Sequence, residues 1–91
     1  MSNEARIAAI RSALEAAFRP DALGIIDDSA RHAGHAGARD GRGHFKVKIV
    51  AGAFAGLALL ARHRAVYAAL GALMETDIHA LQIEAKAPGE Q

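Results

Sequence analysis

The 91-residue sequence contains no cysteine and no tryptophan, and its only aromatic side chains are three Phe and one Tyr. The absence of cysteine excludes disulfide bonds, and any thiolate that binds a metal has to come from another molecule. Because 52% of the residues are hydrophobic and few are aromatic, the core has to be built from small aliphatic side chains. This length and composition predict a single globular domain, residues 1–91, with a modest core.

Long apolar runs are also missing. Arg62 and Arg64 interrupt the longest one, which leaves it shorter than the roughly 18 residues that a membrane-spanning helix needs. The amino terminus begins with polar and acidic residues and lacks the basic and apolar regions of a signal peptide. We therefore expect a cytoplasmic protein without a membrane partner.

The sequence motifs of common enzyme classes are absent as well. No Walker motif or G-x-G-x-x-G loop stands before the central helical stretch, where either would bind phosphate groups. Ser29 and His32 are close in sequence, but no oxyanion-hole motif accompanies them. We therefore expect a protein without enzymatic activity.

Two stretches have the spacing of apolar residues that is typical of a helix. The first can be capped by Ser2 or Asn3 and is ended by Pro20. The second is the central helix, rich in Ala and Leu, which we expect to run from Leu57 to about Glu75–Asp77. The core-facing positions are Ile7, Ile10, Leu14 and Phe18 in the first helix, and Leu59, Val66, Tyr67, Leu70, Leu73 and Met74 in the second.

Three other stretches favour strands. Residues 22–27 form a short apolar run, whereas residues 44–50 and 78–87 alternate between apolar and polar side chains. The order α-β-β-α-β predicts a two-layer α+β domain in which helices cover one face of a three-stranded sheet. Residues 88–91 are expected to form a frayed tail.

His63 is the polar member of the apolar face of the central helix, and it lies between Arg62 and Arg64. One interpretation is a core histidine that is hydrogen-bonded to a backbone carbonyl. The other is a histidine held at the rim of the core as a ligand for a metal or a partner. The helical spacing alone leaves both interpretations open.

A glycine-rich stretch, residues 30–43, carries His32 and His35. Flexible backbone could turn both rings toward one point, and neutral imidazole is a common ligand for Zn, Cu and Fe. Two histidines are too few for a self-contained zinc site, so this incomplete set favours a site shared with another molecule. Residues 34–37 also match the G-x-x-G loop of KH modules, but they join two predicted strands, so we interpret the match as chance.

Positive charge is concentrated in the middle of the chain. Residues 31–64 have a net charge of +6, whereas residues 1–30 sum to −2 and residues 65–91 to −3. A basic segment of this kind attracts an anionic partner, which could be nucleic acid, an acidic protein surface or an anionic cofactor. A solvated basic loop is the alternative interpretation.

Six motifs are spread over nearly the whole chain and occur in the order of the predicted elements. They are Asp28-Ser29-x-x-His32-x-Gly34-His35, His44-Phe45-x-Val47-x-Ile49-Val50, Phe54-x-Gly56, Arg62-His63-Arg64-x-Val66-Tyr67-x-x-Leu70, Ile78-His79-Ala80-Leu81 and Pro88-x-Glu90. Together they resemble the BolA family. The resemblance implies an α+β fold related to the KH type II module, but without its G-x-x-G loop between helices.

The resemblance also implies a function. Proteins of this family partner with monothiol, CGFS-type glutaredoxins, and the heterodimer holds a bridging [2Fe–2S] cluster together with glutathione; no cluster is expected in the isolated chain. The ligands on this side of the cluster would be His63 and one histidine of the glycine-rich stretch, His35 or His32. We interpret His44 as a structural residue or as one that supports a ligand from behind, and we expect His79 to pack between the sheet and a helix. The implied role is a non-enzymatic adaptor in iron–sulfur cluster trafficking or in iron and redox sensing.

The same family implies an alternative function, because its members are also known as DNA-binding transcription regulators of the stress response and cell morphology. The basic face of residues 31–64 would then contact DNA, with affinity that falls steeply as salt rises. Cluster sharing requires His63, whereas DNA binding requires cationic side chains. The cations of this face would be Lys46, Lys48, Arg62 and Arg64.

Overall fold

A computed structural model of the protein describes residues 2–29 and 41–90. The predicted order α-β-β-α-β is confirmed, with a short 3₁₀ helix and a one-turn helix added on either side of the central helix. The elements are α1 (Asn3–Phe18), β1 (Ala22–Asp27), β2 (Gly43–Val50), η3 (Gly52–Phe54), α2 (Leu59–Leu70), α3 (Leu73–Thr76) and β3 (Ile78–Lys86).

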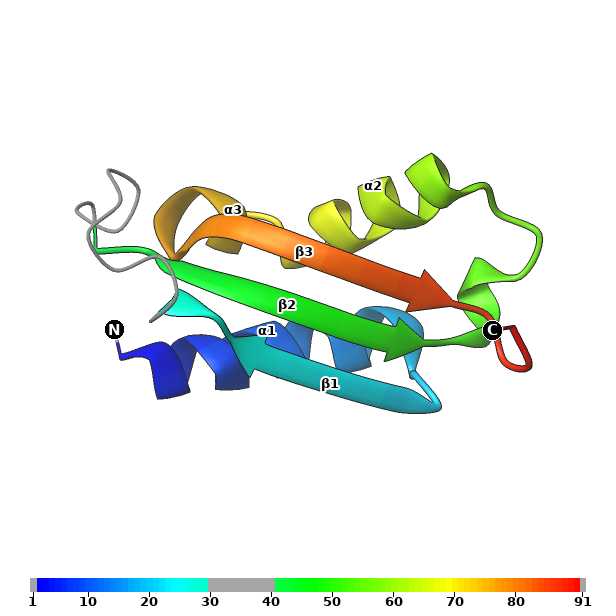
Figure 1. Cartoon of the computed structure of the whole chain (residues 1–91), viewed down its shortest axis with the longest axis horizontal. Coiled ribbons are helices and arrows are strands. Elements are labelled where there is room, and N and C mark those ends of the chain that lie inside the picture. The colour runs from blue at the N-terminus through cyan, green and yellow to red at the C-terminus, as the bar shows by residue number, and fades with distance from the viewer. Residues whose placement is uncertain (1, 30–40, 91) are drawn as a thin grey trace.

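The three strands form one mixed sheet in the order β1-β2-β3. β1 pairs antiparallel with β2, and β2 pairs parallel with β3. Figure 1 shows α1 and α2 on the same side of the sheet, which leaves the other face uncovered. The predicted two-layer α+β architecture is therefore confirmed.

Alternation along β2 decides which side chains enter the core. Phe45, Val47 and Ile49 are almost fully buried beneath the helices, whereas Lys48 is exposed because successive side chains of a strand point to opposite faces. The buried core is completed from the helices, the connections and β3 by Ile10, Leu14, Ala51, Phe54, Val66, Leu70, Ile78 and Ala85.

The first helix begins and ends as its sequence predicts. The Ser2 hydroxyl accepts a hydrogen bond from the backbone N–H of Ala5 at 3.1 Å, which caps the helix. Arg19 then adopts a left-handed conformation with φ of 45°, and Pro20 follows. Ile10 and Leu14 are buried, which confirms the predicted apolar stripe.

The central helix is shorter than predicted. α2 ends at Leu70 because Gly71 has a φ of 54°, which a continuing right-handed helix does not allow, and α3 starts afresh at Leu73. Leu59 and Tyr67 were also expected in the core, but they are 65% and 41% exposed. The arc of α2 that meets the core is narrower than the predicted stripe.

None of the helices in residues 2–29 and 41–90 is long and apolar enough to cross a membrane.

Candidate metal-ligand site around His63

His63 lies on α2 at the rim of the core. The residue is half-buried, and Val66, one turn later, is completely buried. The ring atom Nε2 is buried, and the His63 side chain makes no hydrogen bond within the described residues. The structure therefore does not support the interpretation of His63 as a core histidine that is hydrogen-bonded to a backbone carbonyl.

A buried nitrogen without a partner is costly, since an unmet hydrogen-bonding group lowers stability by roughly 1–3 kcal/mol. A metal ion or a donor from a partner molecule that bound Nε2 would offset this cost, and the ring would have to turn to present this covered atom to a molecule outside the chain. The residues described contain no group of three or more His, Cys, Asp or Glu side chains that could hold a metal. His63 fits a metal ligand in type and surroundings, but the other ligands have to come from elsewhere.

Arg62, the neighbour of His63, is held by three separate parts of the chain. Its Nε donates to the Leu57 carbonyl at 2.9 Å, and its Nη1 donates to the Ala85 carbonyl at 3.1 Å. Both terminal nitrogens also donate to the Glu90 carboxylate, with Nη2 2.8 Å from Oε2. This clamp joins the approach to α2, the end of β3 and the carboxy-terminal turn.

Arg62 and Glu90 each favour the charged form of the other. The Arg62 guanidinium and the backbone N–H of Ala87 lower the pKa of Glu90 to about 2. The hydrogen bond with Glu90 in turn raises the pKa of Arg62. Sequence reasoning missed Glu90 as a positioning residue, although Pro88-x-Glu90 stood out as a motif, and its contacts contradict a tail that frays from residue 88; Gln91 lies outside the described residues.

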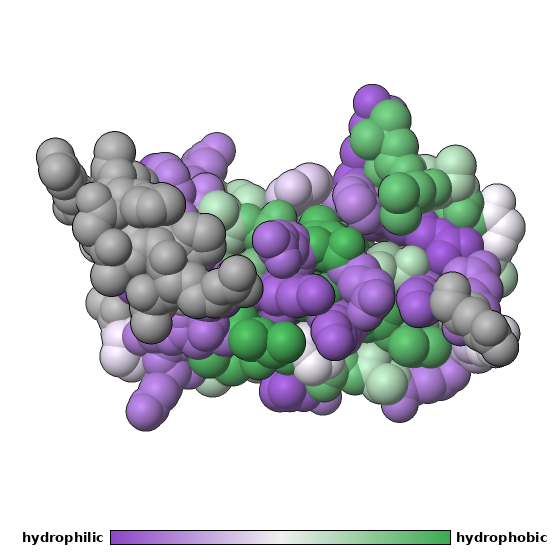
Figure 2. All heavy atoms as spheres, in the orientation of Figure 1, coloured by the Kyte–Doolittle hydropathy of each residue, from purple (hydrophilic) through white to green (hydrophobic). Residues whose placement is uncertain are grey.

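The four cations predicted to form one DNA-binding face do not lie together. Lys46 and Lys48 belong to the uncovered face of the sheet, whereas Arg62 and Arg64 belong to α2 on the other side (Figure 1). The Arg62 side chain is 11% exposed and is committed to Glu90. Figure 2 shows the uncovered face as a mixture of hydrophilic and hydrophobic side chains.

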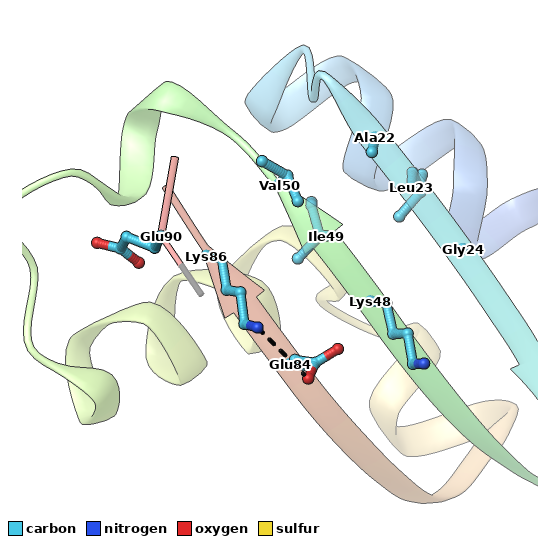
Figure 3. A pocket seen from close by; sticks show the side chains of 9 residues that line it. All are labelled: Ala22, Leu23, Gly24, Lys48, Ile49, Val50, Glu84, Lys86 and Glu90. Carbon is cyan, nitrogen blue, oxygen red and sulfur yellow. Dashed lines mark ion pairs between the residues drawn. The ribbon is translucent and has the colours of Figure 1, made fainter. Parts of the chain in front are cut away.

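An open hollow of about 540 Å³ lies over the ends of the strands on the uncovered face. Figure 3 shows two lysines and two glutamates around it, with Lys86 3.9 Å from Glu84. Because both signs of charge line it, the hollow does not favour an anion. It coincides with no predicted site residue except Lys48.

The two other predicted metal ligands, His32 and His35, lie outside the described residues, as do residues 34–37 of the G-x-x-G match. The structure does describe the two points where the chain enters and leaves this stretch. Ser29 and His44 meet there, because the Ser29 hydroxyl accepts a hydrogen bond from the His44 N–H at 3.0 Å. Asp28 also donates its backbone N–H to the His44 carbonyl at 2.8 Å.

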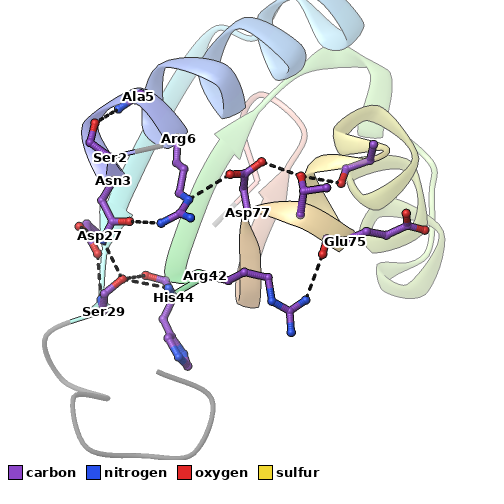
Figure 4. Close-up of polar contacts among 12 residues, drawn as sticks. Ser2, Asn3, Ala5, Arg6, Asp27, Ser29, Arg42, His44, Glu75 and Asp77 are labelled. Atoms are coloured by element: carbon purple, nitrogen blue, oxygen red, sulfur yellow. Dashed lines mark hydrogen bonds and ion pairs between the residues drawn. The ribbon is translucent and has the colours of Figure 1, made fainter. Parts of the chain in front are cut away.

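A polar network links this junction to α1 (Figure 4). The Asn3 amide donates to Asp27 at 3.1 Å and to the Ser29 hydroxyl at 3.2 Å. Burial works to raise the pKa of Asp27, but the hydrogen bonds from Ser29 and Asn3 outweigh it and lower that pKa. Arg6 extends the network by donating to Asn3 at 2.9 Å and to Asp77 at 3.1 Å.

Asp77 anchors the far end of this network. The Thr76 hydroxyl donates to its carboxylate at 2.6 Å, and this bond together with that from Arg6 lowers the pKa of Asp77. Its backbone carbonyl accepts from the Gly43 N–H at 2.9 Å. The amino end of α1 is thereby joined to both ends of the histidine-bearing stretch and to the start of β3.

His44 and His79 lie beside each other near this junction, with ring centroids 5.1 Å apart. His44 is buried, in keeping with a structural role. His79 is exposed, and its Nδ1 lies 3.2 Å from Nη2 of Arg42. The expectation that His79 packs between sheet and helix is wrong, because a register shift opposite Gly43 and His44 breaks the alternation of β3.

Comparison with known proteins identifies the family of this chain. The family model described as BolA-like protein matches residues 14–90. The chain belongs to the BolA-like family.

Individual relatives agree with the family model. The BolA-like chain is 43% identical to the protein BOLA1, chloroplastic, of Arabidopsis thaliana over 90 residues, which cover 96% of this chain and 56% of that protein. It is 40% identical over 74 residues to a protein of Escherichia coli named DNA-binding transcriptional regulator BolA, covering 81% and 68% of the two chains. The chain thus spans only about half of the Arabidopsis relative.

A solved structure of BolA1 from Arabidopsis thaliana has the same fold. It superposes on this BolA-like chain with a TM-score of 0.80 at 38% identity, covering 94% of this chain and 95% of the other. The resemblance expected from the six sequence motifs is confirmed in both sequence and fold.

Proposed function

We propose that this BolA-like protein is a non-enzymatic adaptor that binds a monothiol glutaredoxin and shares a bridging [2Fe–2S] cluster with it, in iron–sulfur cluster trafficking or in iron and redox sensing. The single observation that carries the proposal is the buried, unpartnered Nε2 of His63. The proposal also accounts for the absence of cysteine, because the partner and glutathione would supply the thiolates.

His63 and one of the two loop histidines, His32 or His35, would hold the cluster on this side. When bound, a histidine-ligated cluster has a higher reduction potential than one held only by cysteines, and its retention depends on pH because the imidazoles have to be deprotonated. The Arg62 clamp supports this role, since it fixes the first turn of α2, from which His63 follows directly. The network of Asn3, Arg6 and Asp77 holds the ends of the loop.

The experiment is anaerobic cluster reconstitution of the chain mixed with a monothiol glutaredoxin and glutathione, followed by visible circular dichroism and size-exclusion chromatography. We expect a 1:1 complex whose spectrum differs from that of the glutaredoxin alone. Variants His32→Ala and His35→Ala then identify the second ligand, because only one of them should change the spectrum. If the spectrum of the mixture stays that of the glutaredoxin alone, the proposal fails.

DNA binding is the second candidate function, and it is supported by the name of the Escherichia coli relative. The cations suited to it are Lys46 and Lys48, which share the uncovered sheet face with Lys86. Arg62 is less suited, because its charge is committed to Glu90. A salt titration of binding to duplex DNA separates this function from cluster sharing, because phosphate contacts are lost as salt rises.

A further inference from the structure

Most of the exposed large hydrophobic side chains in residues 2–29 and 41–90 lie on α2 or just before it. They are four of the five such side chains in these residues. Figure 2 shows hydrophobic side chains projecting at the upper right, where α2 begins. We call this surface the α2 apolar patch; its members are Leu57, Leu59, Leu60 and Tyr67, which are 38%, 65%, 59% and 41% exposed.

The α2 apolar patch surrounds His63. Leu59 and Leu60 precede His63 by four and three residues, and Tyr67 follows it by four. Residues with these spacings are neighbours on the surface of a helix. Single exposed hydrophobic residues are ordinary, but a contiguous group marks an interaction surface. This group borders the His63 imidazole, whose buried Nε2 has no hydrogen-bond partner within the described residues.

The lack of further metal ligands near His63 indicates which kind of molecule covers the α2 apolar patch. The described residues contain no group of three or more side chains that could hold a metal, and in the proposed function the partner protein brings its own ligand to the cluster that His63 binds. Metal–ligand bonds of about 2.0–2.3 Å bring the two proteins into direct contact around the site. A partner whose ligand reaches the metal at His63 therefore comes close to its neighbours on α2, which are Leu59, Leu60 and Tyr67.

The charge of α2 selects the same kind of partner. The helix contains no acidic residue, and Arg64 makes no ion pair within the described part of the chain. Arg62 differs, because Glu90 neutralises it. Arg64 thus leaves a positive charge beside the patch, which attracts the negative charge of a thiolate-bound iron cluster.

We propose that the α2 apolar patch is the docking surface for a protein that presents a cysteine thiolate, as a cluster ligand, from an apolar surface of its own. The inference rests on the proposed function, in which that protein is the monothiol glutaredoxin. Docking and ligation are carried out by different residues. The α2 apolar patch determines the affinity of the complex, and His63 determines the ligation, and therefore the spectrum, of the bound cluster.

The test compares Leu60→Asp with Ile26→Asp, a matched control, because Ile26 is 45% exposed on β1 and lies away from α2. The affinity of each variant for the glutaredoxin is measured by isothermal titration calorimetry, and the cluster is examined by visible circular dichroism at saturating glutaredoxin. We expect Leu60→Asp to weaken binding roughly 10- to 30-fold, with an unchanged spectrum at saturation, and Ile26→Asp to bind as the wild type does. Tyr67→Ala provides a second, uncharged variant, for which we expect weaker binding as well.

Three outcomes overturn the inference in distinguishable ways. If the wild type forms the cluster-bridged complex and Leu60→Asp and Tyr67→Ala bind equally well, the docking surface is wrong and the proposed function stands. If Ile26→Asp weakens binding as much as Leu60→Asp, the loss is not specific to the patch, and the docking surface is again wrong. If the wild type forms no complex, the proposed function fails and the docking surface falls with it.

Discussion

Arg62 and Glu90 form a bidentate ion pair that holds the carboxy-terminal turn against the start of α2. The pair places a structural cation directly before the candidate ligand His63. The two arginines of the Arg-His-Arg sequence therefore have different roles. Arg62 anchors the helix through Glu90, and Arg64 is exposed at the surface.

The Arg62–Glu90 pair predicts a specific dependence of stability on pH. The pKa of Glu90 falls from 4.5 to about 2 on folding, so its contribution is fully present above pH 4.5 and is lost as the pH falls toward 2. We expect Glu90→Gln to lower the urea midpoint at pH 6, and the difference from wild type to shrink between pH 4.5 and 2. Glu84→Gln is the control, since Glu84 has only a 3.9 Å contact with Lys86; an equal effect in both variants would contradict the structural role of Glu90.

Gly43 predicts a steric limit at the start of β2. A Cβ atom there would lie 2.5 Å from the Phe45 ring, whereas a Cβ at Gly24 would meet nothing within 4 Å. We expect Gly43→Ala to lower the free energy of unfolding by about 1–3 kcal/mol and Gly24→Ala to change it by less than about 1 kcal/mol, toward higher stability. Urea denaturation measures both; a neutral Gly43→Ala would show that the ring moves aside at little cost.

Much of the fold follows from local patterns. The six residues of β1 agree with the predicted strand end to end, because a short apolar run between turn residues is a local signal. The cap at Ser2 and the stop at Pro20 are local as well. The end of α2 was missed because Gly71 lies within a continuous apolar stretch, and only its positive φ ends the helix.

The misplaced residues of the site depend on contacts between distant parts of the chain. His79 fits the alternation of β3 with Leu81, but one irregular step against β2 turns it outward. Glu90 was assigned to a loose tail because its partner, Arg62, lies 28 residues away. His63 was predicted at the rim of the core because an imidazole on an apolar helix face is visible from spacing. The exposure of Leu59 and Tyr67 was missed because it depends on which arc of α2 packs against the rest of the chain.

The scattered cations lead to a prediction for DNA binding. Any binding to duplex DNA should depend on Lys46 and Lys48, and the double variant Lys46→Ala, Lys48→Ala should reduce the slope of log K against log salt by about 2. Arg64→Ala is the control on the opposite layer, and we expect it to leave the slope unchanged. A larger loss with Arg64→Ala than with the double variant would move the contact surface to α2.

The central claim is that His63 ligates a cluster shared with a monothiol glutaredoxin, and its most direct test is anaerobic reconstitution of wild type, His63→Ala and His79→Ala with that glutaredoxin and glutathione. His79→Ala is the control, because this histidine is exposed and lies at the start of β3. We expect wild type and His79→Ala to give the same visible circular dichroism spectrum of a 1:1 complex, and His63→Ala to lose it while keeping the far-ultraviolet spectrum of the folded chain. A wild-type cluster spectrum from His63→Ala would contradict the account.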